Sequence, residues 1–167
     1  MNRYWKGAIA FLAAFLLQPF LFSLVPGLGI VPDLILCLTA ALTYVYDDNV
    51  GWMAMGAGFA LATDIVSGPF IGIGMLSIIA VEVGILVFKK FFNVENLVNS
   101  AVLAILVTWV YQTVYWIIAA IAGSNYGYLY AMKTIIWQIL FDAVIFMIIY
   151  FIMIRKVTPH RTDRYFG

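Results

Sequence analysis

The sequence predicts an all-α integral membrane protein, with one transmembrane domain over residues 1–167 built as a bundle of six membrane-spanning helices. Hydrophobic residues make up 65% of the chain and charged residues only 10%, against roughly 25% charged in soluble domains. The mean hydropathy of +1.04 is far above that of a water-exposed domain. The apolar runs are long and do not alternate with a period of two, which excludes membrane-spanning β-strands.

The first expected span covers residues 7–25 and follows two basic residues, Arg3 and Lys6. This beginning is similar to a signal peptide, but no small-x-small cleavage site follows, so we expect the segment to be retained as a helix. A Pro-Gly-Leu-Gly run at residues 26–29 predicts the turn that ends it.

Five further spans are expected, since a helix needs about 20 apolar residues to cross the hydrocarbon core of a bilayer. They cover residues 31–46, 50–66, 71–88, 97–122 and 131–154, and the first of these is short for a crossing. Because the breaks between spans are short, we expect neighbouring helices to be antiparallel, with every backbone group in the membrane paired inside a helix.

The distribution of basic residues predicts that both chain ends lie in the cytoplasm. With six spans the two ends share one side, and the opposite side then holds only one basic residue, Lys133. Cytoplasmic segments of membrane proteins carry such an excess of lysine and arginine. The basic residues on the cytoplasmic side are Arg3, Lys6, Lys89, Lys90, Arg155, Lys156, Arg161 and Arg164.

Acidic residues inside apolar runs are costly and are the first candidates for function. Asp33 follows Pro32 at the start of the second span, where proline is favoured at the first helical position and an acid faces the positive end of the helix dipole. We expect Asp33 to cap this helix. Asp64 ends the third span, where the dipole disfavours an anion, so it needs a partner. That partner is Lys133, the backbone amides of residues 67–74, or a ligand or second protein.

Two further acids, Glu82 and Asp142, lie nearer the middle of the fourth and sixth spans. Gln112 and Gln138 lie at comparable depths and are the expected hydrogen-bond partners. Such bonds between helices are worth about 0.6 to 2 kcal/mol each in a membrane. These residues predict either a polar cluster that joins helices or a partner, or a site for an ion or ligand, and the sequence leaves both open.

Small residues form two rows along the third span. Ala54, Gly58 and Ala62 recur every four residues, and Gly56 with Ala60 forms the second row. Such rows allow two helix backbones to approach closely. They predict either packing within the bundle or docking of another membrane protein, and two rows on one helix also allow a homodimer.

No pattern predicts catalysis, so we expect a protein that is not an enzyme, without catalytic, cofactor-binding or metal-binding residues. The single cysteine, Cys37, and the single histidine, His160, cannot form a disulfide or a Cys/His metal site. The glycines of residues 68–74 lack the strand and helix context of a nucleotide-binding loop. A net charge of +1, without a basic stripe, gives no sign of nucleic-acid binding.

Several short motifs follow one another between residues 18 and 84. They are Pro32-Asp33-Leu34-Ile35-Leu36, Gly51, Gly56-Ala57-Gly58-Phe59, Asp64-Ile65, Pro69, Ile71-Gly72 and Leu76. In this order and spacing they resemble the MreD family, the bacterial rod shape-determining membrane proteins. The leucine usual before the family's aspartate is replaced by Ala62-Thr63, and beyond residue 84 the resemblance rests on span count and length.

The resemblance implies a non-enzymatic subunit of the cell-elongation complex, the elongasome, in the bacterial inner membrane. Family members bind the bitopic protein MreC, and they act with MreB filaments and the RodA–transpeptidase synthase to control peptidoglycan synthesis and rod shape. The candidate residues for partner contact, packing or a pocket are Pro32, Asp33, Gly56, Gly58, Phe59, Asp64 and Gly72, together with Glu82, Lys133 and Asp142.

The family also resembles in fold the substrate-binding S components of energy-coupling-factor vitamin transporters, which are small six-span bundles. S components often dock a transmembrane coupling subunit through an Ala-x-x-x-Ala row in the first helix, and Ala10 with Ala14 fits this row. A vitamin-binding subunit is therefore the alternative function. Its outer pocket would be lined by a few convergent polar groups, here Asp33, Asp64, Lys133 and the tyrosines of residues 126–130.

Overall fold

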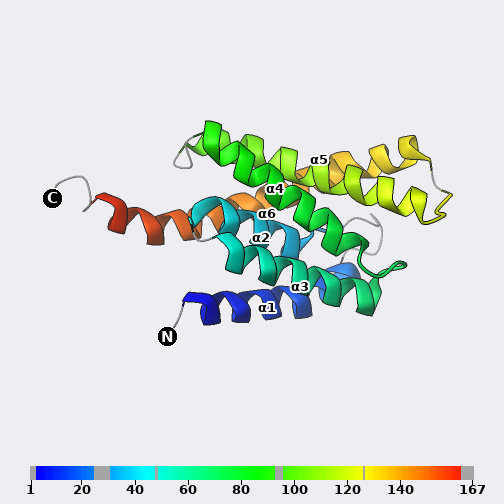
Figure 1. Cartoon of the computed structure of the whole chain (residues 1–167), viewed down its shortest axis with the longest axis horizontal. Helices are drawn as coiled ribbons and strands as arrows, with labels where there is room; N and C mark the ends of the chain where they lie inside the picture. The colour runs from blue at the N-terminus through cyan, green and yellow to red at the C-terminus, as the bar shows by residue number, and fades with distance from the viewer. Residues whose placement is uncertain (1–2, 25–30, 48, 93–95, 126, 163–167) are drawn as a thin grey trace.

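The computed structural model of the chain describes residues 3–24, 31–47, 49–92, 96–125 and 127–162. These residues form six helices and no strand, and each predicted apolar run corresponds to one helix (Figure 1). The helices are α1 (Arg3–Leu24), α2 (Leu34–Val45), α3 (Asn49–Ser67), α4 (Ile73–Phe91), α5 (Leu97–Ile121) and α6 (Tyr128–Thr162).

Four helices contain segments long and apolar enough to cross a membrane: Tyr4–Leu21, Val50–Ser67, Leu97–Ile121 and Ile135–Arg155. Many of their large apolar side chains face outward, such as Leu16 at 57% and Ile136 at 69% exposure. Soluble monomers rarely expose apolar surface over such an extent. The lengths and the outward apolar faces indicate a membrane protein.

The helices α2 and α4 fall outside this group, for different reasons. α2 has 12 residues, which makes it about 18 Å long, whereas the hydrocarbon core is about 30 Å thick. α4 has 19 residues, but Glu82, Lys89 and Lys90 interrupt its apolar run. Length and composition therefore identify four spans among the described residues, fewer than the six that the sequence predicts.

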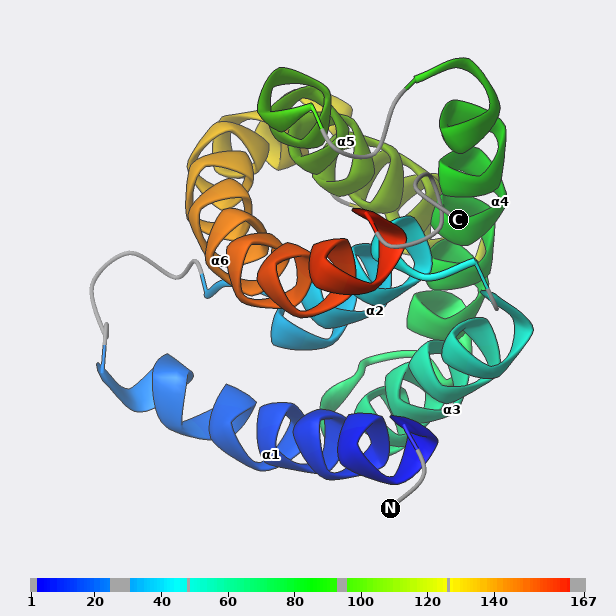
Figure 2. The same cartoon turned by 90° about the vertical axis from the view of Figure 1, so that its left-hand side faces the viewer.

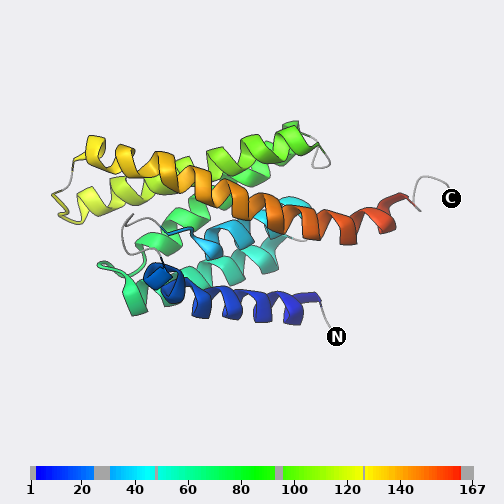
Figure 3. The same ribbon diagram turned by 180° about the vertical axis from the view of Figure 1, so that it is seen from behind.

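The short helix α2 lies at the centre of the bundle (Figure 2). It contacts each of the other helices, and every residue from Ile35 to Val45 is buried. Around it α3 pairs with α4, α4 with α5 and α5 with α6, while α1 contacts only α2 and α3 over the described residues. α1 begins and α6 ends at the same end of the bundle, where α6 extends beyond its neighbours (Figure 1 and Figure 3).

The two small-residue rows of α3 have different surroundings. Gly56 is buried against α2, where an added Cβ would come closer than 3.0 Å to three side-chain atoms of Thr39. Gly58 is exposed, and an added Cβ there would meet nothing within 4 Å. Of the two predicted uses of these rows, Gly56 therefore packs within the bundle, whereas Gly58 does not pack against another helix of the chain's described residues. Phe59, which follows Gly58 on the chain, joins α3 to α1 by stacking on Phe11, with the ring centroids 5.5 Å apart.

Candidate functional site

The start of α2 is held by its own N-cap. Asp33 has an extended backbone, and its Oδ1 accepts a hydrogen bond from the amide of Leu36 at 3.0 Å. A carboxylate in this position satisfies one of the unpaired amides in the first turn of a helix. The cap predicted for Asp33 is thus confirmed. The prediction that Pro32 occupies the first helical position is wrong, because the helix begins at Leu34, after the residue that caps it.

A second carboxylate, Asp142 of α6, is buried against the start of α2 and is 1% exposed. Its Oδ1 accepts the backbone amide of Asp33 at 2.8 Å, and its Oδ2 accepts the hydroxyl of Thr108 at 3.3 Å. The side-chain amide of Gln138 donates to Asp142, at 3.2 Å from Oδ1, and to the carbonyl of Val31 at 2.7 Å. Asp142 therefore joins α2, α5 and α6, and its expected bond to Gln138 is confirmed.

A third carboxylate, Asp64, joins the end of α3 to the start of α4. Its Oδ2 accepts the backbone amides of Gly72, Gly74 and Met75 at 3.1, 2.8 and 3.3 Å. Amides at a helix N-terminus lack partners within the helix, and a negative charge there is favourable. Of the partners predicted for Asp64, the amides of the loop are the ones that it contacts.

This contact explains two glycines at the start of α4. Gly72 has a φ of +92°, in the left-handed region that glycine enters without steric strain. An added Cβ on Gly74 would lie 2.5 Å from Oδ1 of Asp64. The loop therefore wraps its amides around Asp64 only with glycine at these two positions, which gives Gly72 a structural role.

A small cavity lies between Asp33 and Asp64 and is lined also by Thr63 and Tyr111. Its volume is about 20 Å³. A cavity of about 10–15 Å³ already holds one water molecule, so this one has room for a single water-sized group and not for a vitamin. Gln18 and Tyr111 also hydrogen-bond to the side chain of Asp33. The site is thus a compact polar cluster that links the start of α2, the end of α3 and the start of α4 to side chains within α5 and α6.

The opposite end of α2 is held by Lys89 of α4. Its Nζ donates to the carbonyl oxygens of Thr43 and Tyr46 at 3.1 and 2.7 Å and lies 3.8 Å from Oδ1 of Asp47. The last carbonyls of a helix lack partners within the helix, and a cation stabilises them through the dipole. Sequence reasoning used Lys89 only for orientation and missed this role. The short second span was the available signal, because a buried helix end must find partners.

Two candidate residues do not join the polar cluster. Glu82 is 1% exposed within α4, and its Oε1 has no hydrogen-bond partner among the described residues. Its expected partner, Gln112, is therefore not bonded to that oxygen. Lys133 is exposed near the start of α6, and none of the hydrogen bonds described for the three aspartates involves it.

The cluster joins helix ends and offers little that would hold a ligand. Within the part of the chain that the structure describes, no group of three or more His, Cys, Asp or Glu residues is arranged to hold a metal ion. No protein-family model, curated protein or solved structure matches the chain.

Proposed function

We propose that the protein is a non-enzymatic membrane scaffold of the cell-elongation complex, similar to MreD. In this role it binds MreC in the bacterial inner membrane, requires no cofactor, and acts indirectly on MreB and the RodA–transpeptidase synthase to control peptidoglycan synthesis and rod shape. The order of the motifs between residues 18 and 84 is the basis for this family assignment.

The hydrogen bonds of the buried aspartates favour the scaffold over the vitamin-binding alternative. Asp33, Asp64 and Asp142 each bond to backbone amides of the bundle itself, and the cavity between the first two is about 20 Å³. A vitamin pocket needs convergent polar groups that remain free for the ligand. Polar groups committed to helix ends support a protein that works through its outer surfaces.

The outer surface offers suitable faces for a single-span partner. On α3 the row with Ala54 and Gly58 is exposed, and nothing lies within 4 Å of an added Cβ at Gly58. Small residues on a helix face let a second helix approach closely in lipid. We assign the docking of MreC to this row, which runs along one of the four long apolar helices.

The proposal includes six crossings, an S-component-like bundle and cytoplasmic chain ends. The common location of the start of α1 and the end of α6 supports an even number of crossings (Figure 3). The excess of basic residues on that side supports a cytoplasmic location. α2 and α4 complete the six, with the short α2 enclosed by the other helices.

Depletion of the protein in its rod-shaped host, combined with co-purification of MreC, tests the proposal. Depleted cells should become round, and the tagged protein should capture MreC from membranes. Gly58→Leu should weaken this capture, whereas Gly84→Leu, at an exposed glycine of α4 that also has nothing within 4 Å, should retain it. A normal cell shape together with tight vitamin binding by the purified protein would overturn the scaffold in favour of the S component.

Orientation is tested separately with a reporter enzyme fused after Gly167. Activity of a cytoplasmic reporter is expected. Activity of a periplasmic reporter at the same position contradicts the proposed topology while leaving the docking proposal to its own test.

A further inference from the structure

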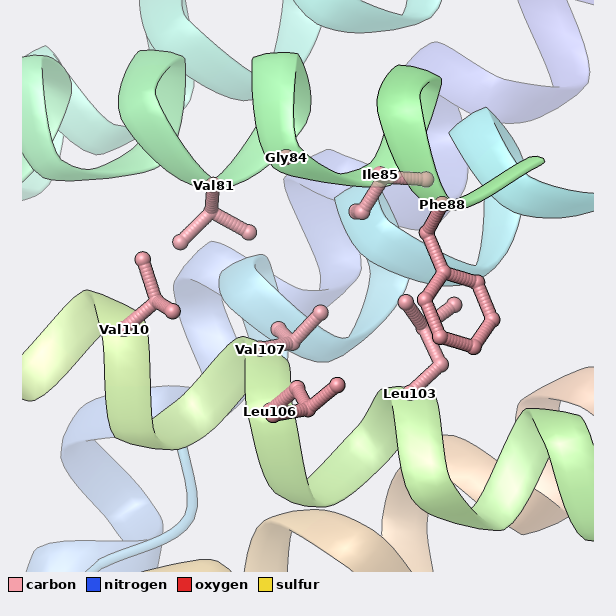
Figure 4. A pocket seen from close by; sticks show the side chains of 8 residues that line it. All are labelled: Val81, Gly84, Ile85, Phe88, Leu103, Leu106, Val107 and Val110. Carbon is pink, nitrogen blue, oxygen red and sulfur yellow. The ribbon is translucent and has the colours of Figure 1, made fainter. Parts of the chain in front are cut away.

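An apolar groove runs between α4 and α5, away from the polar cluster. Figure 4 shows side chains from both helices pointing into the space between them. Its floor is formed by Val81, Ile85, Leu103 and Val107, each 5% exposed or less. The volume is about 140 Å³. The groove thus has a floor within the protein.

The groove opens outward between Gly84 of α4 and Leu106 of α5. Gly84 is exposed and an added Cβ would meet nothing within 4 Å, while Leu106 is 39% exposed. Phe88 and Val110 lie at its two ends (Figure 4). The opening lies along the apolar span of α5, so it faces the hydrocarbon of the membrane.

Size and chemistry select the occupant. The lining contributes aliphatic side chains, one phenylalanine and a glycine, with no side-chain hydrogen-bonding group that would hold water. A buried apolar cavity of about 150 Å³ stays dry and binds groups the size of benzene. A helix, with a diameter of about 10–12 Å, cannot enter such a space. A flexible hydrocarbon chain can.

Packing supplies the driving force in the membrane. In lipid, an apolar chain gains little from leaving its solvent, so a bound chain must gain dispersion contacts with the protein. A groove without an occupant forfeits those contacts along its floor. The stretch of α4 from Val81 to Phe88 extends the groove over about 10 Å, which suits an elongated chain lying parallel to the helix.

We propose that this groove is a binding site for one acyl chain of a bilayer phospholipid, held between Gly84 and Leu106 above the floor of the α4–α5 pair. The chain completes the packing of these two helices from outside. The inference is independent of the scaffold role, because the groove shares no residue with the polar cluster or with the exposed row of α3.

A phospholipid carrying a diazirine in the middle of its acyl chain tests the site in the purified full chain reconstituted in bilayers. Photolabelling should concentrate on peptides that contain residues 81–88 and 103–110. It should be lost in Gly84→Leu and in Leu106→Phe, two variants that fill the opening from opposite helices. Gly58→Leu is the matched control on α3 and should keep the label.

Size-exclusion profiles and unfolding transitions establish that both filling variants are folded before labelling is compared. Native mass spectrometry should also show one phospholipid retained by the unmodified chain and by Gly58→Leu, and none by Gly84→Leu. Equal labelling of all lipid-facing helices, or unchanged labelling in both filling variants, would overturn the proposal. Crosslinking from the Leu106 position to a second copy or another protein would also overturn it.

Discussion

α1 and α2 are neighbouring apolar helices that depend on the bundle in opposite ways. α1 has 22 residues and contacts only α2 and α3, and only 11% of its apolar segment is buried. α2 has 12 residues and contacts every other helix, and its residues from Ile35 to Val45 are all buried. The longer helix is held along one face, whereas the shorter one is enclosed on all sides.

The difference shows why polar residues occur inside the apolar runs of this chain. A helix that crosses the whole bilayer ends where water can satisfy its terminal amides and carbonyls. A short enclosed helix ends inside the protein, where unpaired backbone groups are costly. Side chains supply these partners at the two ends of α2: Asp33 and Asp142 at its start, and Lys89 at its end.

The largest expected effect comes from truncating the enclosed helix. Leu36→Ala should lower the free energy of unfolding by about 2–5 kcal/mol, because the side chain is 1% exposed and leaves a cavity. Leu16→Ala on α1, which is 57% exposed, should change it by at most about 0.5 kcal/mol. Unfolding in mixed micelles with increasing dodecyl sulfate measures both, and equal losses would contradict the comparison.

Removing the carboxylate at the start of α2 comes next. Asp142→Leu should cost about 3 kcal/mol, since it strands the amide of Asp33, the hydroxyl of Thr108 and the amide of Gln138. Asp142→Asn keeps one acceptor oxygen and should cost clearly less. Proteolysis of residues 31–34 should increase with the same ranking, and a reversed ranking argues against this role of Asp142.

The small-residue rows of α3 provide a matched pair. Gly56→Leu should cost about 2 kcal/mol by overpacking against Thr39. Gly58→Leu should leave the unfolding transition within about 0.5 kcal/mol of the parent, because its surroundings are open. The same micelle titration compares the two, and a destabilised Gly58→Leu would refute the outward orientation of its row.

The smallest effect is expected at the far end of α2. Lys89→Met should cost about 1 kcal/mol by removing the donor to the carbonyls of Thr43 and Tyr46. Lys90→Met removes an exposed lysine from the same helix turn and should be neutral. Hydrogen exchange at the last turn of α2 should accelerate only in Lys89→Met, and acceleration in both variants would indicate a general charge effect instead.

Much of this architecture could be predicted from hydropathy and local chemistry. The six apolar runs correspond to the six helices, and the Asp33 cap followed from its position before a helix. The need of Asp64 for a partner followed from its position at a helix end. Pairings between distant helices could not be predicted, because they depend on how the helices rotate. Periodicity alone could not tell the inward Gly56 from the outward Gly58.

In the candidate site, too, contacts within one helix could be predicted from the sequence, whereas contacts between distant helices could not. Asp142 was recognisable as an intramembrane acid, and Gln138 four residues earlier was a natural partner on the same helix face. Thr108 and Tyr111 carry ordinary helix-compatible side chains, and only the packing of α5 against α2 and α6 brings them to the cluster. The groove between α4 and α5 is also a tertiary feature, made where two apolar faces diverge.

The supports of α2 also impose an order on biosynthesis. Three of the side chains that hold its ends, Lys89, Gln138 and Asp142, are translated after it, and the last two only with the final helix. A ribosome that has released only the first five helices into the membrane has therefore made a central helix whose start lacks Gln138 and Asp142. We expect α2 to settle in its final position only when α6 has been inserted, so that chains truncated before residue 138 are recognised and degraded by membrane proteases.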